Sequence, residues 1–209
     1  MKYRALILPL LFVMSCGSAQ KTVPHEKRLL VIVNDLHNAT GEKIYDSIGE
    51  SSTSLYIHEL TKTDMFRIIE RQRLEDILKE MKLSMTGLVD SSKMKQVGKI
   101  LGADAVVFVE LSSAQYTNST KSLGSSESVK ELLKVVISAR VVTIETGEVL
   151  ASATDSSDYK NSYTKLGEVA KTGTGMDRPK LVQKSISDSA PRLCDSVAKQ
   201  MKKWYKARG

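Results

Sequence analysis

Cysteine and histidine are scarce in this chain, which contains two cysteines and three histidines in 209 residues. The histidines, His25, His37 and His58, are far apart in the sequence and form no H-E-x-x-H pattern, and no C-x-x-C pattern accompanies them. Because protein metal sites use such closely spaced ligands, the sequence predicts no metal site.

Patterns that bind phosphate groups or hold a nucleophile are also missing. The chain has no G-x-S-x-G, Walker or G-x-G-x-x-G motif, and Gly173-Thr174-Gly175 lies in a polar stretch without the strand and helix that would make it a phosphate loop. We therefore expect no enzyme activity, no catalytic residue and no bound cofactor.

Arginine-rich clusters are absent too, although the chain is basic, with a formal net charge of +7. Loss of Lys2 and Arg4 with the leader described below lowers this charge to +5, spread along the chain. Such a distribution suits a solvated surface near anionic lipid or polymer, and it argues against sequence-specific nucleic-acid recognition.

Only the first fifteen residues contain a long apolar run. Lys2 and Arg4 precede an apolar stretch from Ala5 to Met14, which is typical of a secretory signal and too short to remain as a membrane-spanning helix. The segment Val13-Met14-Ser15-Cys16 resembles the lipobox of bacterial lipoproteins, in which the cysteine thiol is acylated before cleavage. We expect Cys16 to carry lipid, with palmitate as one of its acyl groups, and to anchor the protein to a membrane.

The residues after Cys16 indicate to which membrane the lipoprotein is exported. Gly17 and Ser18 follow Cys16 without an aspartate, a pattern similar to that of lipoproteins exported to the outer membrane of diderm bacteria. We expect an outer-membrane anchor with the protein facing the periplasm. An ordinary signal peptide cut near Ala19, with Cys16 discarded, is the alternative, and the missing A-x-A pattern argues against it.

The rest of the chain has the length of one domain, and no other stretch is apolar enough to span a membrane. We expect a signal peptide at 1–15, an acylated tether at 16–28 and one domain at 29–207. With Cys16 taken by lipid, Cys194 has no partner for a disulfide, and its place near an apolar helical stripe predicts a small buried residue.

Hydrophobic spacing predicts alternating strands and helices along the domain. The clearest helix follows Gln72, where Leu74, Ile77, Leu78 and Met81 form one apolar stripe. Gly102 can end a shorter helix in a left-handed cap. The expected strands are 29–33, 66–69, 105–109, 133–141 and 149–154, and the other expected helices are 42–62, 94–101 and a final one with a stripe from Ile186 to Trp204.

Two polar stretches are expected to be irregular: 118–128 as a connection and 155–179 as a long loop. Pro191 must kink the final helix or begin its main part. The resulting order is strand, helix, strand, helix, helix, strand, strand, strand, helix. This order predicts a single α/β domain with helices packed on a mixed sheet.

Four stretches together resemble the CsgG superfamily, whose best-known member is an outer-membrane lipoprotein that exports curli subunits. The resemblance covers about residues 29–155, and related lipoproteins include HfaB and, more distantly, LpoB. The four stretches are Val33-Asn34 with Asn38 to Gly41, Phe66 to Gln72 with Leu74 and Ile77 to Glu80, Lys99 to Asp104, and Arg140 to Val142 with Thr146 to Leu150.

The resemblance implies a non-catalytic envelope lipoprotein that assists secretion or assembly of surface polymers, such as curli, through contacts with other envelope proteins. It also allows a homo-oligomer. The alternative is an LpoB-like activator of a penicillin-binding protein in peptidoglycan synthesis. The curli exporter builds its pore from two long hairpins per subunit. The corresponding regions here, about 112–132 and 152–172, read as shortened and too polar for a lipid-facing surface, so we expect no pore.

Three smaller groups of residues admit structural interpretations. Glu70-Arg71 can pair with neighbours or favour the start of the following helix. Tyr45 is the only aromatic candidate for a constriction after the first strand, and we expect it to pack in the core. The basic and aromatic run at the C-terminus either stays solvated at the negative end of its helix or touches anionic lipid or a partner. This run comprises Lys199, Lys202, Lys203, Trp204, Tyr205, Lys206 and Arg208.

Overall fold

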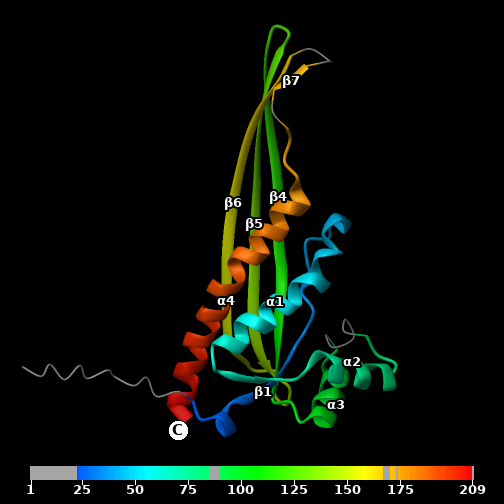
Figure 1. The fold of residues 1–209 in the computed structure, drawn as a ribbon, viewed down its shortest axis with the longest axis vertical. Helices are drawn as coiled ribbons and strands as arrows, with labels where there is room; N and C mark the ends of the chain where they lie inside the picture. The colour runs from blue at the N-terminus through cyan, green and yellow to red at the C-terminus, as the bar shows by residue number, and fades with distance from the viewer. Residues whose placement is uncertain (1–22, 85–89, 167–169, 173, 209) are drawn as a thin grey trace, which may run out of the picture.

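We analysed the protein in a computed structural model, which describes residues 23–84, 90–166, 170–172 and 174–208. Its helices and strands follow the expected order, with short additions (Figure 1). The strands are β1 Leu29–Val33, β2 His37–Asn38, β3 Phe66–Ile68, β4 Ala105–Leu123, β5 Ser126–Thr143, β6 Val149–Leu166 and β7 Ala170–Thr172. The helices are η1 His25–Lys27, η2 Lys43–Tyr45, α1 Ile48–Lys62, α2 Arg71–Glu80, α3 Ser91–Leu101 and α4 Arg178–Arg208. Within the described part, none of the helices is long and apolar enough to cross a membrane.

The strands form one mixed sheet in the order β3-β1-β4-β5-β6-β7, with β2 paired to β4. Strand β1 is parallel to both β3 and β4, whereas β4, β5, β6 and β7 are joined by antiparallel pairs. The predicted α/β fold class, the element order and the mixed sheet are confirmed.

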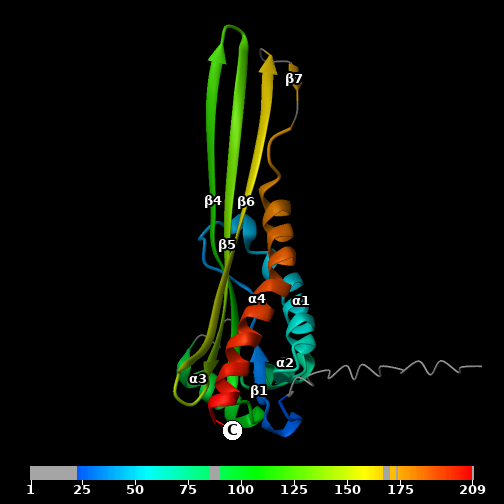
Figure 2. The ribbon, with the colours of Figure 1, turned by 90° about the vertical axis from the view of Figure 1, so that its left-hand side faces the viewer.

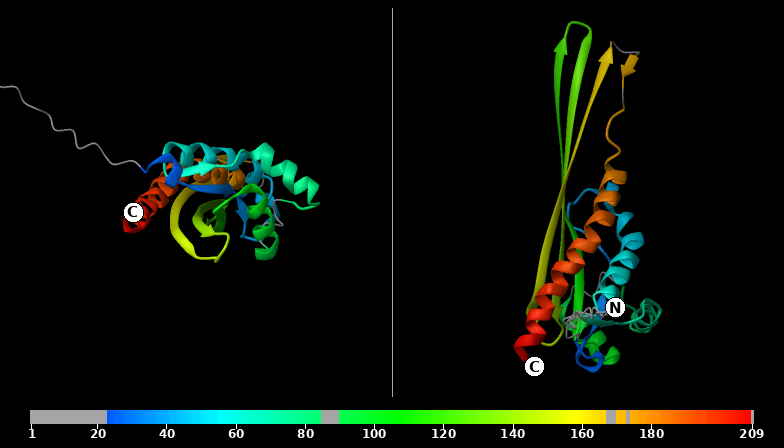
Figure 3. Two further views of the ribbon diagram at one scale, coloured as in Figure 1. Left: turned by 90° about the horizontal axis from the view of Figure 1, so that it is seen from below. Right: turned by 60° about the vertical axis from the view of Figure 1, so that its left-hand side comes forward.

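Helices α1 and α4 lie together across one face of the sheet (Figures 1 and 3). The strands supply alternate residues such as Val107, Leu111, Leu133 and Ile137 to this face, as the period of a strand requires. The buried side chains of α4 recur at three- and four-residue spacing; they are Val182, Ser185, Ile186, Ser189, Ala190, Leu193, Cys194, Val197 and Met201.

Helices α2 and α3 build a second, smaller core on the other face of the sheet. Leu78 of α2 and Val97 of α3 pack there with Ile32, Val106 and Ile144. Since Ile32 and Val106 alternate with the strand residues of the first core, each of these two strands is buried on both sides. This explains why β1 and the start of β4 read as continuous apolar runs.

Both ends of α3 are capped, and the cap predicted at Gly102 is confirmed. The Asp90 side chain caps its first turn by accepting hydrogen bonds from the N–H groups of Ser92 and Lys93. Gly102 ends the helix with a φ of 67°, in the left-handed region where glycine has no side chain to clash.

The predicted irregular stretches 118–128 and 155–179 are largely wrong. Strands β4 and β5 pair as far as Leu123 and Ser126, and β6 continues to Leu166, so three strands extend well beyond the helices (Figure 2). We call the projecting part of this sheet the extension; it comprises residues 115–134 of β4 and β5 and residues 158–166 of β6. Its side chains lie mostly in water, so the apolar alternation of a half-buried strand is lost while the backbone ladder persists.

Two further boundaries differ from expectation. The alternative that Pro191 begins the main part of the final helix is wrong, because α4 begins at Arg178 and runs through Pro191 as one helix of 31 residues. The predicted helix at 42–62 begins only at Ile48, after the short η2 turn.

Candidate functional site

A carboxylate lies where the extension meets the body. Glu131 of β5 is 7% exposed and accepts hydrogen bonds from the Tyr116 hydroxyl at 2.6 Å, the Asn161 side-chain amide at 2.8 Å and the Met176 backbone N–H at 2.9 Å. Burial raises the pKa of Glu131, but these hydrogen bonds outweigh burial and lower the pKa below its ordinary value. The charged carboxylate thus fixes the segment before α4 against the sheet.

An arginine at the start of α4 continues this polar contact. Arg178 donates hydrogen bonds to the Tyr45 hydroxyl from Nε at 3.2 Å and from Nη2 at 3.0 Å, and it forms an ion pair with Glu42. Its guanidinium carbon also lies 5.0 Å from the centre of the Tyr116 ring and 5.7 Å from that of Tyr45. Glu42, Tyr45, Tyr116, Glu131 and Arg178 together form what we call the junction network.

The junction network joins four elements that are distant in the sequence: the η2 region, β4, β5 and the start of α4. Its carboxylates accept hydrogen bonds from neighbouring donors, and none of its members is a free nucleophile. Across the described ranges, no group of three or more His, Cys, Asp or Glu side chains is arranged to hold a metal. The arrangement suits the fixing of a projecting surface in one orientation.

The face of the extension that lies away from α4 is hydroxyl-rich and basic. Lys121, Lys130, Lys134 and Lys160 lie on this face and are exposed, and Asp158 is its acidic member on β6. Nearer the body, this face carries a groove lined by residues that include Asp46, Phe108, Glu110 and Arg140. The Arg140 guanidinium carbon lies 5.3 Å from the centre of the Phe108 ring.

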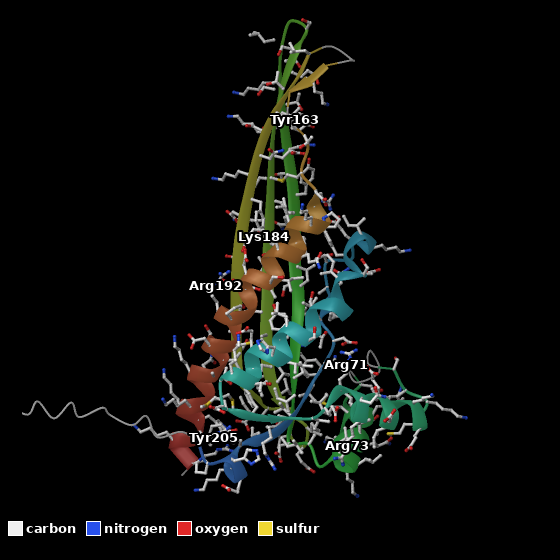
Figure 4. The ribbon with its side chains drawn as sticks, in the orientation of Figure 1. Arg71, Arg73, Tyr163, Lys184, Arg192 and Tyr205 are labelled. Carbon is white, nitrogen blue, oxygen red and sulfur yellow. The ribbon has the colours of Figure 1, made fainter. Side chains whose placement is uncertain are left out.

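At the opposite end of the molecule, the end of α4 contacts the start of β1. The Tyr205 hydroxyl accepts a hydrogen bond from Leu29 N at 2.8 Å and donates one to the Met65 carbonyl at 2.9 Å. Figure 4 shows Tyr205 at this end, which we call the basal end, and Tyr163 near the far end of the extension. The basal end and the extension therefore point in opposite directions.

The structure tests some of the residues that were predicted from the sequence to be functional or buried, and not others. Cys16, the predicted lipidation site, lies outside the described residues. Cys194 is buried, as expected, and burial raises the pKa of its thiol to about 12. Tyr45 packs in the core, as expected. Arg71 pairs with Asp35 at 2.5 Å and with Glu75 at 2.7 Å, which confirms the structural interpretation of that position.

Neither Glu131 nor Arg178 was predicted from the sequence. A signal for Glu131 was present, because the alternation of Leu133 to Val141 continues backwards through Glu131 to Val129 and places the carboxylate on the helix-covered face. Arg178 carried no such signal, because its partners Tyr45 and Tyr116 come from remote segments.

These features define an α/β domain with a projecting antiparallel sheet. The chain belongs to the CsgG family, because the family model described as "Curli production assembly/transport component CsgG" matches residues 13–207. Comparison with curated protein sequences found no match.

Several solved structures are similar to this chain at low sequence identity. A homolog of neuraminyllactose-binding hemagglutinin from Helicobacter pylori is 12% identical, with a TM-score of 0.51 over 90% of this chain and 95% of that chain. Lipoprotein GNA1162 from Neisseria meningitidis is 14% identical, with a TM-score of 0.46 over 80% of this chain and 99% of that chain. The LpoB C-terminal domain from Salmonella enterica is 15% identical, with a TM-score of 0.42 over 62% of this chain and 82% of that chain.

Proposed function

We propose that this protein is a non-catalytic envelope lipoprotein, anchored in the outer membrane through lipid on Cys16, that assists the secretion or assembly of a surface polymer through protein contacts. Membership of the CsgG family supports the envelope role. The lipobox-like residues before Cys16 support the anchor, and the periplasm is the compartment that we propose for the folded domain.

The observation that carries the proposal is the extension. Strand β4 pairs with β2 as far as Leu111, and beyond it no described strand covers the outer edge of β4. Strand β7 covers only Thr164 to Leu166 of β6. Free strand edges present rows of unpaired N–H and C=O groups that a partner strand can bind. A sheet that leaves the body with its edges open is therefore a surface for protein partners, including a second copy.

The extension can be tested by shortening it in register. Ser119 of β4 faces Lys130 of β5, so replacing Thr120 to Val129 by Asn-Gly removes the far end and closes the hairpin without a register shift. In the native host, we expect the variant to reach the membrane at the wild-type level while the surface polymer is lost. Normal polymer on cells that carry only the shortened protein would contradict the proposal.

The anchor is tested separately with Cys16→Ala. We expect this variant to incorporate no fatty-acid analogue and to accumulate as precursor or at the wrong location, because the acylated thiol is missing. Equal labelling of the variant and the wild type would exclude Cys16 as the lipidation site.

The rival role, activation of a penicillin-binding protein, predicts a different result. The purified lipoprotein would then raise the rate of glycan polymerisation by that enzyme, and the surface polymer would persist in the shortened variant. A stable homo-oligomer in detergent together with polymer loss would favour the role that we propose.

A further inference from the structure

We propose that the basal end of the molecule docks on the anionic phospholipid headgroups of the membrane that holds the acyl anchor. The docking surface consists of the last turns of α4 together with η1. This inference rests on the anchor at Cys16, and it adds an orientation: the base lies on the membrane and the extension points away from it.

The basal end carries cations that are not neutralised. Lys202, Lys203 and Lys206 are exposed on α4, and none of them forms an ion pair with another described residue. Lys199, about one turn earlier on the same helix, pairs with Asp195 at 2.6 Å. Unpaired lysines close to a surface are attracted by anionic lipid.

The carboxylate on the connection between α1 and β3, Asp64, is already paired with a cation. Asp64 forms an ion pair with Arg28 at 2.9 Å. Lys27 and Glu26 of η1 are both exposed, and Asp104 is an exposed acid just before β4. The α4 lysines therefore retain an excess of positive charge at this end.

An aromatic pair lies within the same surface. Trp204 is half-buried, and its ring meets the ring of Tyr205 edge to face with their centres 5.1 Å apart. The Arg208 guanidinium carbon lies 4.3 Å from the centre of the Trp204 ring. Tryptophan side chains are favourable at the boundary between apolar and aqueous surroundings. Trp204 beside exposed lysines therefore suits contact with the headgroup layer of a membrane.

Chain length places the anchor at the same end. Val23 accepts a hydrogen bond from Arg28 Nε at 3.0 Å and is thereby fixed beside the start of β1. The seven Cα-to-Cα steps from Cys16 to Val23 reach at most about 25 Å when the chain is extended. The 18 residues of β5 span roughly 60 Å, and the turn between β4 and β5 lies at the far end of the molecule from this base (Figure 1). The acyl anchor therefore reaches the membrane from the base and leaves the tip remote.

The chain contains a single tryptophan, so Trp204 reports on this surface directly. The experiment uses the mature lipoprotein reconstituted in bilayers that contain brominated lipids, with either phosphatidylglycerol or phosphatidylcholine as the main component. We expect quenching of Trp204 fluorescence in the anionic bilayers and its loss in the zwitterionic ones. Salt at about 0.5 M should also abolish quenching, because it shortens the screening length to a few ångströms.

The triple variant K202Q/K203Q/K206Q should lose the quenching in anionic bilayers. The matched control K121Q/K130Q/K160Q removes three exposed lysines from the extension and should leave the quenching unchanged. Equal quenching of Trp204 in the two lipids, or an equal loss of quenching in both triple variants, would refute the proposed docking surface. A protein that fails to stay with either bilayer would instead refute the anchor, so the two failures are distinguishable.

Discussion

Glu131 and Arg178 show how single residues fix the extension on the body. Glu131 accepts hydrogen bonds from two strands and from the segment before α4, while Arg178 lies close to the rings of both Tyr45 and Tyr116. Hydrogen bonds to a charged group are stronger than those between neutral groups. The junction network therefore resists rotation of the extension relative to the helices.

Removal of the Glu131 carboxylate should destabilise the fold. We expect Glu131→Ala to lower the free energy of unfolding by about 1–3 kcal/mol, because three donors lose a charged acceptor. Glu127→Ala is the matched control: Glu127 lies on the same face of β5 but pairs only weakly, at 3.9 Å, with Lys165, so its loss should cost under about 1 kcal/mol. Urea unfolding of the two variants tests this, and equal costs would refute the assignment.

The same residue predicts a pH dependence. The pKa of Glu131 is lowered in the folded protein from its ordinary value of 4.5, so its contribution is present above that value and is lost as the pH falls through the folded-state pKa. The stability gap between wild type and Glu131→Gln should therefore shrink in acid. Unfolding curves collected from neutral to acidic pH measure the gap, and a gap that widens in acid would be inconsistent with a charged carboxylate.

At the scale of elements, α2 and α3 depend on close packing over the second core. Leu74 and Leu78 are buried, whereas Ile77 and Met81 lie at the margin of the stripe and are half-buried. The apolar spacing thus predicted the correct buried face of α2, but it did not show which residues of that face are most buried. The difference arises because only part of the stripe lies under α3 and the sheet.

This ranking can be measured. We expect Leu78→Ala to cost about 2–5 kcal/mol of unfolding free energy, since a side chain that is 3% exposed leaves a cavity behind. Ile77→Ala should cost clearly less because water already reaches that side chain. Chemical denaturation of both variants distinguishes them, and the reverse order would show that α2 is rotated about its axis.

Helix α3 depends on a glycine for its approach to the sheet. A Cβ at Gly98 would lie 2.7 and 2.8 Å from two side-chain carbons of Ile144. We expect Gly98→Ala to destabilise by about 1–3 kcal/mol through overpacking, although alanine favours a helix over glycine. The cost should fall in an Ile144→Ala background, and a double-mutant cycle measures that coupling. Additive costs would exclude the contact.

At the scale of the whole molecule, the body and the extension obtain their stability differently. The body contains both hydrophobic cores, while the far half of the extension is held mainly by strand pairing. Because backbone ladders with solvated side chains contribute little apolar burial, loss of the tip should not unfold the body.

The in-register replacement of Thr120 to Val129 by Asn-Gly should therefore leave the thermal midpoint of the body within a few degrees of wild type. The junction network and both cores lie outside the removed residues, and Val129 is the buried side chain that the replacement removes. Circular dichroism during heating gives the midpoint, with the triple lysine variant of the extension as a full-length control. A collapse of the midpoint would show that the tip is part of the cooperative unit.

The sequence by itself determined the order of elements, the α/β class and the Gly102 cap. Gly102 predicted the end of α3, and the stripe of α4 was visible from Ile186 onwards, because caps and helical faces depend on residues close in sequence. The buried strands β1 and the start of β4 were visible for a similar reason, since burial on both sides leaves a continuous apolar run.

Only the tertiary structure decided that residues 112–123 and 155–166 are strands and that Glu131 lies in the junction network. In these segments the side chains mostly face water, and the stabilising hydrogen bonds join the backbones of different strands. The sequence therefore shows no alternation of apolar and polar residues there. Glu131 and Arg178 acquire their roles from partners that are remote in the chain. Interactions of that kind depend on the arrangement of elements in space, which a local pattern of residues does not encode.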